Sequence, residues 1–246
     1  MMNPTKFVRP KSLKQTYHNY CPGCGHGIVH RLIAEVIDEL GIRENTIGVA
    51  PVGCAVFAYD YWDFDVTEAP HGRPPAVATG IKRVLPNRIV FTYQGDGDLA
   101  AIGTAEIIHA ANRSENITVI FVNNTVYGMT SGQMAPTTIV GQKTLTTPYG
   151  REISRDGYPL KVCELLSVLD GTKFIARGSV TNPKNVVQTK SYIKKAFMKQ
   201  IENKGFSLVE ILSMCPSGLH MSPIETIKWI EEELVKFFPL GVYKDV

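Results

Sequence analysis

The amino-acid sequence predicts an α/β fold with a doubly wound, mainly parallel sheet, the kind of fold that binds a ligand at one sheet edge. Helical and strand patterns alternate from residue 27 onward. Several strand-length runs, such as residues 117–122, are continuously apolar, as in strands buried on both faces. A glycine-rich acidic turn stands directly between a strand pattern and a helix pattern. Strands separated by helices of this length indicate right-handed βαβ units within one domain, residues 1–246.

The first half of the chain justifies this prediction element by element. Apolar residues at helical spacing predict a helix over 28–40, which ends at Gly41, a favourable residue after a helix. A short apolar strand is predicted at 46–52. Residues 76–85 form the next predicted helix, which ends before Pro86. A strand at 88–93, a helix at 99–111 and a strand at 117–122 complete the central βαβ unit.

The second half continues the alternation less cleanly. Helices are predicted at 160–169, 183–203 and 223–237, and strands at 173–176 and 206–212. Two stretches, 51–75 and 125–158, fit neither pattern. Because long irregular stretches in a compact domain usually serve function, we expect both to belong to a site.

Composition excludes several classes of protein. The chain of 246 residues has 44% hydrophobic and 20% charged residues, ordinary for a globular protein. The net charge of +3 comes without a basic stripe, so no nucleic-acid partner is expected. No apolar stretch approaches the length of a membrane span, and the first 20 residues lack the apolar core of a secretion signal. We therefore expect no membrane partner and a cytoplasmic protein.

The acidic turn is the first candidate site. Gly95, Asp96, Gly97 and Asp98 follow a predicted strand and precede a helix, where the backbone can approach phosphate oxygens. Asn123 and Asn124 end the next strand, so both groups belong to the same sheet edge. Carboxylate and amide oxygens suit Mg²⁺. A glycine-aspartate turn alone is more often a simple tight turn. The strand, the helix and the asparagine pair together favour a Mg²⁺-diphosphate site.

Four cysteines form the second candidate site. Cys21 and Cys24 make a Cys-x-x-Cys pair, and Cys54 and Cys215 each follow a predicted strand at the same sheet edge. Such a set suits either an iron–sulfur cluster or a structural zinc ion, and the spacing leaves both open. Cys163 lies inside a predicted helix and is expected to be a buried apolar residue.

The irregular stretch 51–75 contains a third candidate. His71 suits proton transfer near neutral pH, and Arg73 suits recognition of a substrate carboxylate, with Gly72 between them. The alternative is an ordinary loop histidine and a surface arginine. His26 and His220 adjoin the cysteines and are expected to order those loops, whereas His109 is expected to be structural.

The acidic turn followed by the asparagine pair resembles the thiamine diphosphate motif, and this resemblance covers the whole central βαβ unit. It implies that Mg²⁺ is held by Asp96, Asn124 and the backbone carbonyl of Val126.

Nearly the whole chain resembles the β subunit of the 2-oxoacid:ferredoxin oxidoreductases, of the branched-chain type. The resemblance rests on Cys-Pro-Gly-Cys-Gly-His at 21–26, Gly53-Cys54, His71-Gly72-Arg73, the acidic turn, Asn-Asn and the late Cys-Pro. It implies a 4Fe-4S cluster on Cys21, Cys24, Cys54 and Cys215. It also implies a set of cofactor-binding residues: Gly53, Cys54, Gly72, Gly95, Asp96, Gly97, Asp98, Asn124 and Val126.

The same resemblance implies a reaction and partners. The family oxidatively decarboxylates a 2-oxo acid with coenzyme A to acyl-CoA and CO₂, and electrons pass through the cluster to ferredoxin. An α subunit supplies the activating glutamate, and γ and ferredoxin-like δ subunits complete the complex. This chain alone is therefore expected to be inactive.

Residues after Cys54 bear on the substrate. Val56, Phe57 and Tyr59 offer nothing to a second carboxylate, so an apolar acid such as 2-oxoisovalerate is expected over 2-oxoglutarate. The alternative is that these side chains only pack under the cluster. Two rival functions remain: a thiamine diphosphate-dependent decarboxylase or synthase subunit without redox chemistry, and a zinc-stapled interaction module.

Overall fold

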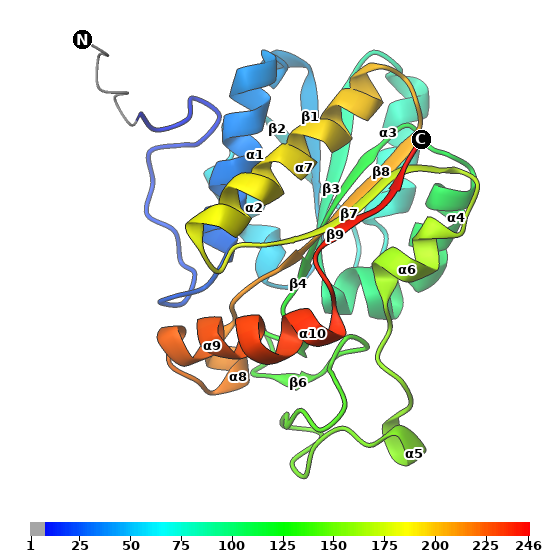
Figure 1. Ribbon diagram of the computed structural model, residues 1–246. Coiled ribbons are helices and arrows are strands. Elements are labelled where there is room, and N and C mark those ends of the chain that lie inside the picture. The colour runs from blue at the N-terminus through cyan, green and yellow to red at the C-terminus, as the bar shows by residue number, and fades with distance from the viewer. Residues whose placement is uncertain (1–7) are drawn as a thin grey trace.

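The computed structural model describes residues 8–246, and its centre is a seven-stranded sheet (Figure 1). The part of the N-terminal segment that lies in residues 1–7 is outside the described residues. In sheet order, the strands are β2 (Asp65–Glu68), β1 (Thr46–Ala50), β3 (Ile89–Gly95), β4 (Thr118–Asn123), β8 (Phe206–Leu212), β7 (Thr172–Ser179) and β9 (Gly241–Asp245). All neighbours are parallel except β7 and β9. The predicted doubly wound, mainly parallel fold is confirmed.

Helices cover both faces of the sheet. On one face lie α1 (His26–Leu40) and α7 (Pro183–Ile201), and on the other lie α3 (Pro74–Val84), α4 (Thr104–Asn112) and α6 (Val162–Ser167) (Figure 1). Each face buries its own apolar cluster, built around β3, β4, β7 and β8. These central strands are buried on both faces, which explains their unbroken apolar sequences.

The remaining elements lie mainly around one end of the sheet. They are α2 (Ala58–Tyr61), α5 (Ile153–Asp156), α8 (Pro216–Leu219), α9 (Pro223–Trp229), α10 (Val235–Phe237) and the small hairpin β5 (Val126–Tyr127) and β6 (Gln133–Met134). Short 3₁₀ helices occur at Arg43–Asn45 and Cys54–Phe57, and π-helical segments at Gly97–Ile102 and Ile230–Leu234. Figure 1 shows α8, α9, α10 and β6 grouped beyond the end of the sheet where β4 finishes.

Two predictions about elements need correction. The predicted helix over 99–111 is broken at Gly103, with a π-helical segment before it and α4 after it. A Cβ atom on Gly103 would lie 2.5 Å from the Asp98 carbonyl oxygen and 2.7 Å from that of Gly72, so the backbone of the 71–73 loop packs directly on this break. Strands β2 and β9 were not predicted, because edge strands that are largely exposed lack the apolar run of a central strand.

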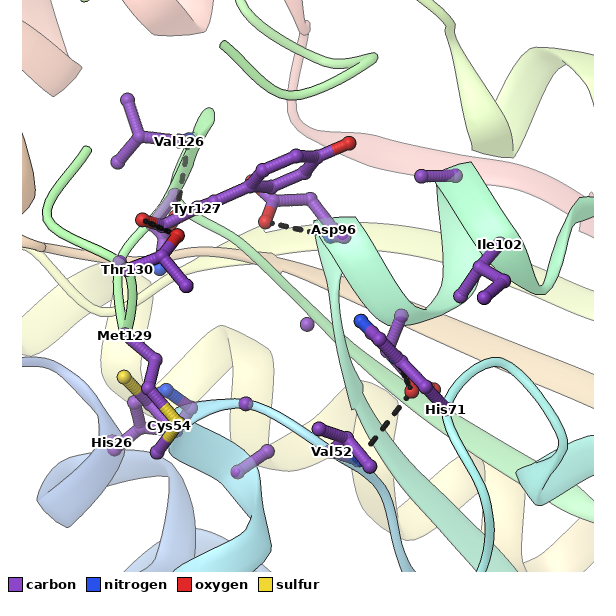
Figure 2. Close-up of a pocket in the computed structure, with 18 residues that line it drawn as sticks. His26, Val52, Cys54, His71, Asp96, Ile102, Val126, Tyr127, Met129 and Thr130 are labelled. Atoms are coloured by element: carbon purple, nitrogen blue, oxygen red, sulfur yellow. Dashed lines mark hydrogen bonds and ion pairs between the residues drawn. The ribbon is translucent and has the colours of Figure 1, made fainter. Parts of the chain in front are cut away.

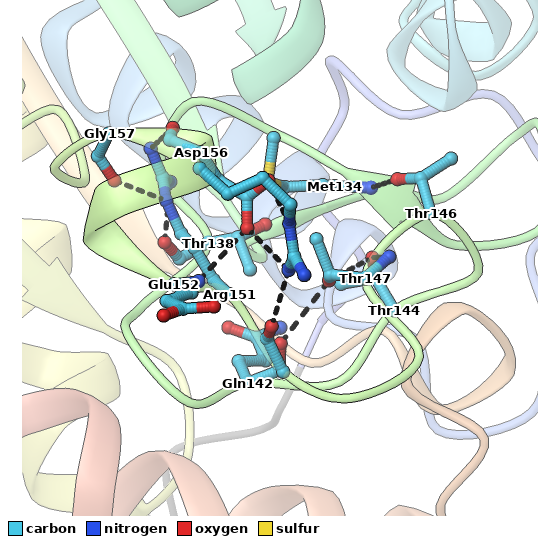
Figure 3. A network of polar contacts seen from close by, with 12 residues as sticks. Met134, Thr138, Gln142, Thr144, Thr146, Thr147, Arg151, Glu152, Asp156 and Gly157 are labelled. Atoms are coloured by element: carbon cyan, nitrogen blue, oxygen red, sulfur yellow. Dashed lines mark hydrogen bonds and ion pairs between the residues drawn. The ribbon is translucent and has the colours of Figure 1, made fainter.

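One buried arginine stabilises the long segment 128–158, which is irregular apart from β6 and α5. Arg151, which is 5% exposed, donates hydrogen bonds to six backbone carbonyls. Figure 3 shows it with three of these partners, Thr138, Asp156 and Gly157. The acceptors are the carbonyl oxygens of Ala135, Pro136, Thr138, Asp156, Gly157 and Tyr158, at 2.6–3.3 Å. Burial lowers the pKa of this guanidinium. Because the acceptors come from both ends of the stretch, Arg151 ties these ends together.

No helix within residues 8–246 is both long and apolar enough to cross a membrane.

Candidate functional site

Asp96 stands where β3 ends, and its carboxylate is buried among neutral groups. Its Oδ1 accepts from the Gly97 N–H at 3.0 Å and its Oδ2 from the Thr137 hydroxyl at 3.2 Å. The side chain is 3% exposed, and burial raises its pKa to about 7. Neither hydrogen-bond partner carries a positive charge. A buried carboxylate in such surroundings is stabilised by a bound cation.

Asn124 follows β4, the strand next to β3, as the sequence predicts. Its Oδ1 accepts from the Val126 N–H at 3.2 Å, which fixes the amide oxygen on the loop between them. Thr125, the residue in between, has a φ of 65°, an unusual value for a β-branched residue. Asp96, Asn124 and Val126 line one cavity. Oxygen atoms of these types fit the ligand preference of Mg²⁺.

The cavity has a volume of about 350 Å³ and opens at the carboxyl ends of the parallel strands. Figure 2 shows His71 and Ile102 on one side of it, and Cys54 and Met129 on the other. Among the predicted site residues, those that line it are Gly53, Cys54, His71, Gly95, Asp96, Gly97, Asp98, Asn124 and Val126.

The absence of a side chain at Gly97 allows the ring of Tyr127 to pack against the acidic turn. A Cβ atom there would lie 2.9 Å from ring carbons of Tyr127, which also lines the cavity. The tyrosine therefore packs closely over the acidic turn, where only glycine leaves enough space.

His71 is oriented by Asp98. The Asp98 carboxylate is 1% exposed, and its Oδ1 accepts from His71 Nδ1 at 2.6 Å and from the Gly72 N–H at 2.8 Å. Its Oδ2 accepts from Gln94 Nε2 at 2.7 Å. Since a carboxylate can only accept, the imidazole proton lies on Nδ1, and Nε2 is the acceptor of the neutral ring. No spacing rule predicts this pair, because its members are 27 residues apart.

Arg73 lies elsewhere. Its guanidinium forms an ion pair with Glu106 on α4, and it is not among the residues that line the cavity. Gly72 also stays outside the lining and instead packs its backbone against Gly103. The predicted contact of Arg73 with a substrate carboxylate stays a prediction.

Of the four predicted cluster cysteines, Cys54 lines this cavity, and Cys215 lies close to it beside Gly128. The Sγ atoms of Cys215 and Cys54 lie 3.0 and 3.7 Å from the position that a Cβ atom on Gly128 would take. Burial, together with the charge of neighbouring thiolates, raises the pKa of Cys24 to about 11 and that of Cys215 to about 12. The thiolates that act are Cys21 and Cys54 on Cys24, and Cys24 and Cys54 on Cys215. Cys24, Cys54 and Cys215 are therefore neighbouring thiols whose ionisation is disfavoured by burial.

No three His, Cys, Asp or Glu side chains between residues 8 and 246 are gathered closely enough to hold a single metal ion. All five cysteines are free thiols. Cys163 is buried in α6, where its thiol contacts the Ala176 carbonyl oxygen at 3.6 Å, as expected for a core residue.

Comparison with known proteins shows the family of this chain. The family described as thiamine pyrophosphate enzyme, C-terminal TPP binding domain, matches residues 52–211. The chain is 38% identical over 242 residues to 2-oxoglutarate synthase subunit KorB of Methanocaldococcus jannaschii, covering 95% of this chain and 84% of that subunit. The chain belongs to the thiamine diphosphate-binding subunits of the 2-oxoacid oxidoreductases.

Other relatives of this thiamine diphosphate-binding subunit differ in length. Ketoisovalerate oxidoreductase subunit VorA of Methanothermobacter thermautotrophicus is 50% identical over 239 residues, which cover 97% of this chain and 50% of VorA. The chain thus spans about half the length of that relative. A solved structure, the 2-oxoglutarate:ferredoxin oxidoreductase from Magnetococcus marinus, superimposes with a TM-score of 0.81 at 26% identity. It covers 98% of this chain and 86% of that one.

One expectation about this subunit's cavity is corrected. Val56, Phe57 and Tyr59 do not line it. Phe57 instead packs edge-on against Tyr20, with ring centroids 6.1 Å apart, because the 3₁₀ helix after Gly53 turns this side chain away. The packing alternative is the one that the structure supports for Phe57.

The apolar lining comes from residues that sequence reasoning missed. Val52, Ile102 and Met129 are 44%, 50% and 46% exposed and all border the cavity. The periodic pattern of a segment does not report which of its apolar residues face a cavity, so only the fold identifies them.

His26 lines the cavity from the cysteine side. Its Nδ1 bonds the Tyr93 hydroxyl at 2.5 Å, and Tyr20 stacks on its ring at 4.8 Å between centroids. Burial lowers its pKa to about 4, so the ring is neutral. These contacts order the segment around Cys21 and Cys24, as expected.

Proposed function

We propose that this chain is the cofactor-binding subunit of an enzyme that oxidatively decarboxylates an apolar, branched-chain 2-oxo acid with coenzyme A. The products are acyl-CoA and CO₂, and two electrons pass through a 4Fe-4S cluster to ferredoxin. The observation that carries the proposal is that Cys54 lines the same cavity as Asp96 and Asn124. Redox chemistry needs an electron acceptor next to the reacting carbon, and a thiol in the wall of this cavity supports such an arrangement.

In this proposal Asp96, Asn124 and the Val126 carbonyl hold Mg²⁺, and Gly95 and Gly97 leave room for the diphosphate. When bound, thiamine diphosphate supplies an electron sink for the carbon next to the departing carboxylate. The chain's own residues bind and orient the cofactor. The glutamate that activates it is proposed to come from an α subunit, and γ and δ subunits to complete the complex around this domain, residues 1–246.

The four cysteines are proposed to hold the cluster instead of a zinc ion, because electron transfer needs a redox-active centre and zinc has no redox chemistry. Cys24, Cys54 and Cys215 lie close enough together for the charge of one thiolate to raise the pKa of another. This proximity supports a shared site.

His71 is proposed to move a proton. Asp98 holds the proton on Nδ1, so Nε2 is the atom that accepts or returns a proton at the cavity. Arg73 lies on the same loop and forms an ion pair with Glu106. It is proposed to recognise the substrate carboxylate.

The preference for an apolar acid rests on the lining. Val52, Ile102 and Met129 border the cavity, and no lysine or arginine does so within residues 8–246. A second carboxylate would find no partner in this chain, and an unpaired buried charge is costly. The 50% identity to a ketoisovalerate oxidoreductase subunit supports the same preference, compared with 38% for a 2-oxoglutarate synthase subunit.

The deciding experiment compares kcat/KM for 2-oxoisovalerate and 2-oxoglutarate under anaerobic conditions, on the complex that co-purifies with this chain. We expect a clear preference for 2-oxoisovalerate. Iron and acid-labile sulfide should fall by one cluster per chain in Cys54→Ala and stay at the wild-type level in Cys163→Ala. A preference for 2-oxoglutarate contradicts the substrate class. One zinc per chain without iron favours the interaction module, and thiamine diphosphate without iron favours a decarboxylase without redox chemistry.

A further inference from the structure

A buried series of polar contacts leads from strand β7, next to the edge strand β9, to the loop that carries Asn124. Arg177 on β7 and Glu210 on β8 face each other in register, and both side chains are 0% exposed. Arg177 Nε lies 2.8 Å from Glu210 Oε2. The other oxygen, Glu210 Oε1, accepts from Asn123 Nδ2 at 2.7 Å. Three neighbouring strands are thus joined through their side chains.

Asn123 connects Glu210 to the loop that follows β4. Its Oδ1 accepts from the Thr125 N–H at 3.1 Å, so the amide is used at both ends. That bond holds Thr125 in its left-handed conformation, with a φ of 65°. Asn124 and Val126, two proposed Mg²⁺ ligands, stand on either side of Thr125. The orientation of both therefore depends on how Asn123 is held.

Arg177 is held in turn by further partners. Its Nη2 lies 2.6 Å from Glu164 Oε2 on α6, and its Nη1 donates to the Pro239 carbonyl at 3.2 Å and to the Tyr243 hydroxyl. The guanidinium is thereby fixed from several sides, and Glu210 faces a rigid counter-charge.

A buried ion pair is weak support for stability, because desolvation of the two charges offsets their attraction. Apolar side chains of similar volume would pack between the strands as well or better. What the pair adds is a fixed direction: a carboxylate clamped at one oxygen presents the other at a defined place. Asn123 binds at that place.

We propose that Arg177 and Glu210 are positioning residues for the metal site of the cofactor, acting through Asn123. The inference rests on the proposed function, since it requires Mg²⁺ and thiamine diphosphate at Asp96 and Asn124.

The test measures the affinity for Mn²⁺, a paramagnetic substitute for Mg²⁺, with saturating thiamine diphosphate, on the protein isolated with the subunits that co-purify with it. Loss of a partner that orients a metal ligand typically costs about 10–100-fold in metal affinity. We expect Asn123→Ala to weaken Mn²⁺ binding within that range, and Glu210→Gln to weaken it in the same direction. The double variant Asn123→Ala/Glu210→Gln should bind Mn²⁺ no more weakly than Asn123→Ala alone. Both changes act on the same contact, the hydrogen bond between Asn123 and Glu210.

Glu115→Gln is the matched control. Glu115 is 8% exposed, forms ion pairs with Arg83 and Arg113, and precedes β4, whereas Asn123 ends it. This variant should lose stability without losing Mn²⁺ affinity. Arg177→Met combined with Glu210→Met removes both buried charges at once, so it keeps the test available if Glu210→Gln does not fold. The paired variant should fold and still bind Mn²⁺ more weakly than the wild type.

The outcomes separate the two proposals. If Asp96→Ala binds the metal as tightly as the wild type, the proposed function itself fails. If Asp96→Ala abolishes binding but Asn123→Ala and the Arg177/Glu210 pair variant bind as the wild type does, the positioning role is wrong and the proposed function stands. Additive losses in the double variant also overturn the inference.

Discussion

At the scale of single residues, the candidate site contains two aspartates, Asp96 and Asp98, whose hydrogen-bond partners determine what each carboxylate can bind. Asp96 has neutral partners and a pKa raised to about 7 by burial, which suits a group that meets a cation. Asp98, two residues later, has both oxygens occupied by His71, Gly72 and Gln94. The two aspartates of one turn therefore have different tasks, although the sequence treats them alike.

The Asp98–His71 pair gives the first prediction. Asp98→Asn should lower kcat of the complex by about 10²-fold or more, because proton transfer by a positioned side chain contributes about 10²–10⁴-fold and the histidine loses its fixed tautomer. Thiamine diphosphate content should not change. Measurement of kcat and of bound cofactor in Asp98→Asn, His71→Ala and the double variant checks this. The double variant should be no worse than His71→Ala, since the residues act as a unit. Wild-type kcat in Asp98→Asn would show that His71 does not need this partner.

At the scale of elements, the position of the loop that carries His71 depends on a close backbone contact between Gly72 and Gly103. Gly72 has a φ of 78°, and a Cβ atom on it would lie 2.7 Å from the Gly103 nitrogen. Close backbone contact with the break before α4 thus sets the height of the loop over the cavity.

Gly72→Ala is therefore expected to destabilise the protein by about 1–3 kcal/mol, from overpacking and a strained φ. Equilibrium unfolding in denaturant measures this change. Gly80→Ala is the matched control: Gly80 lies inside α3 with no atom within 4 Å of its added Cβ. It should gain about 0.5–1 kcal/mol. Equal effects of the two substitutions would mean that the contact between Gly72 and Gly103 does not hold the loop.

The irregular segment 128–158 is an element held by one side chain. Arg151 donates to carbonyls at both of its ends, and Thr137 within it contacts Asp96. Order in this segment and order at the metal site are thereby linked.

We expect Arg151→Met to raise the rate of proteolytic cleavage between residues 128 and 158 by about tenfold or more, because each hydrogen bond to a charged donor contributes about 1.5–3 kcal/mol. Limited proteolysis followed by mass spectrometry locates and times the cleavage. Arg155→Met, at a half-exposed side chain in the same segment, should change the rate little. If both variants resist the protease equally, other contacts hold the segment.

At the scale of the whole molecule, binding at the sheet edge should stabilise the entire fold, since the ligands follow central strands β3 and β4. A ligand at 100 times its Kd adds about 2.7 kcal/mol to the free energy of unfolding. For a chain of this size, 1 kcal/mol shifts Tm by about 2–4 °C. Mg²⁺ with thiamine diphosphate should therefore raise Tm by about 5–11 °C in calorimetry, and EDTA should reverse the shift. Asp96→Ala should show no shift. A shift of equal size in Asp96→Ala would place the metal elsewhere.

Much of the architecture follows from local patterns. The boundaries of β8 were predicted to the residue, and those of α1, α7 and β4 within a few, because an apolar core on both sheet faces imposes regular spacing. The edge strands β2 and β9 carry no such constraint and were missed. The π-helical segment after Asp96 was missed as well, since the contact between Gly72 and Gly103 that accompanies it joins distant parts of the chain.

The sequence by itself determined the fold class and where the candidate ligands stand along the chain. Asp96, Asn124, Cys54 and Cys215 are recognisable because each follows a strand, and the ends of parallel strands lie at one edge of a sheet. Only the tertiary structure decided which groups meet there: His71 with Asp98, Asn123 with Glu210, and Val52, Ile102 and Met129 around the cavity in place of Phe57. The physical reason is that hydrophobic periodicity indicates which residues of a helix or strand lie on its buried face. Hydrogen bonds and cavity walls depend on how separate elements dock, and no local period encodes that.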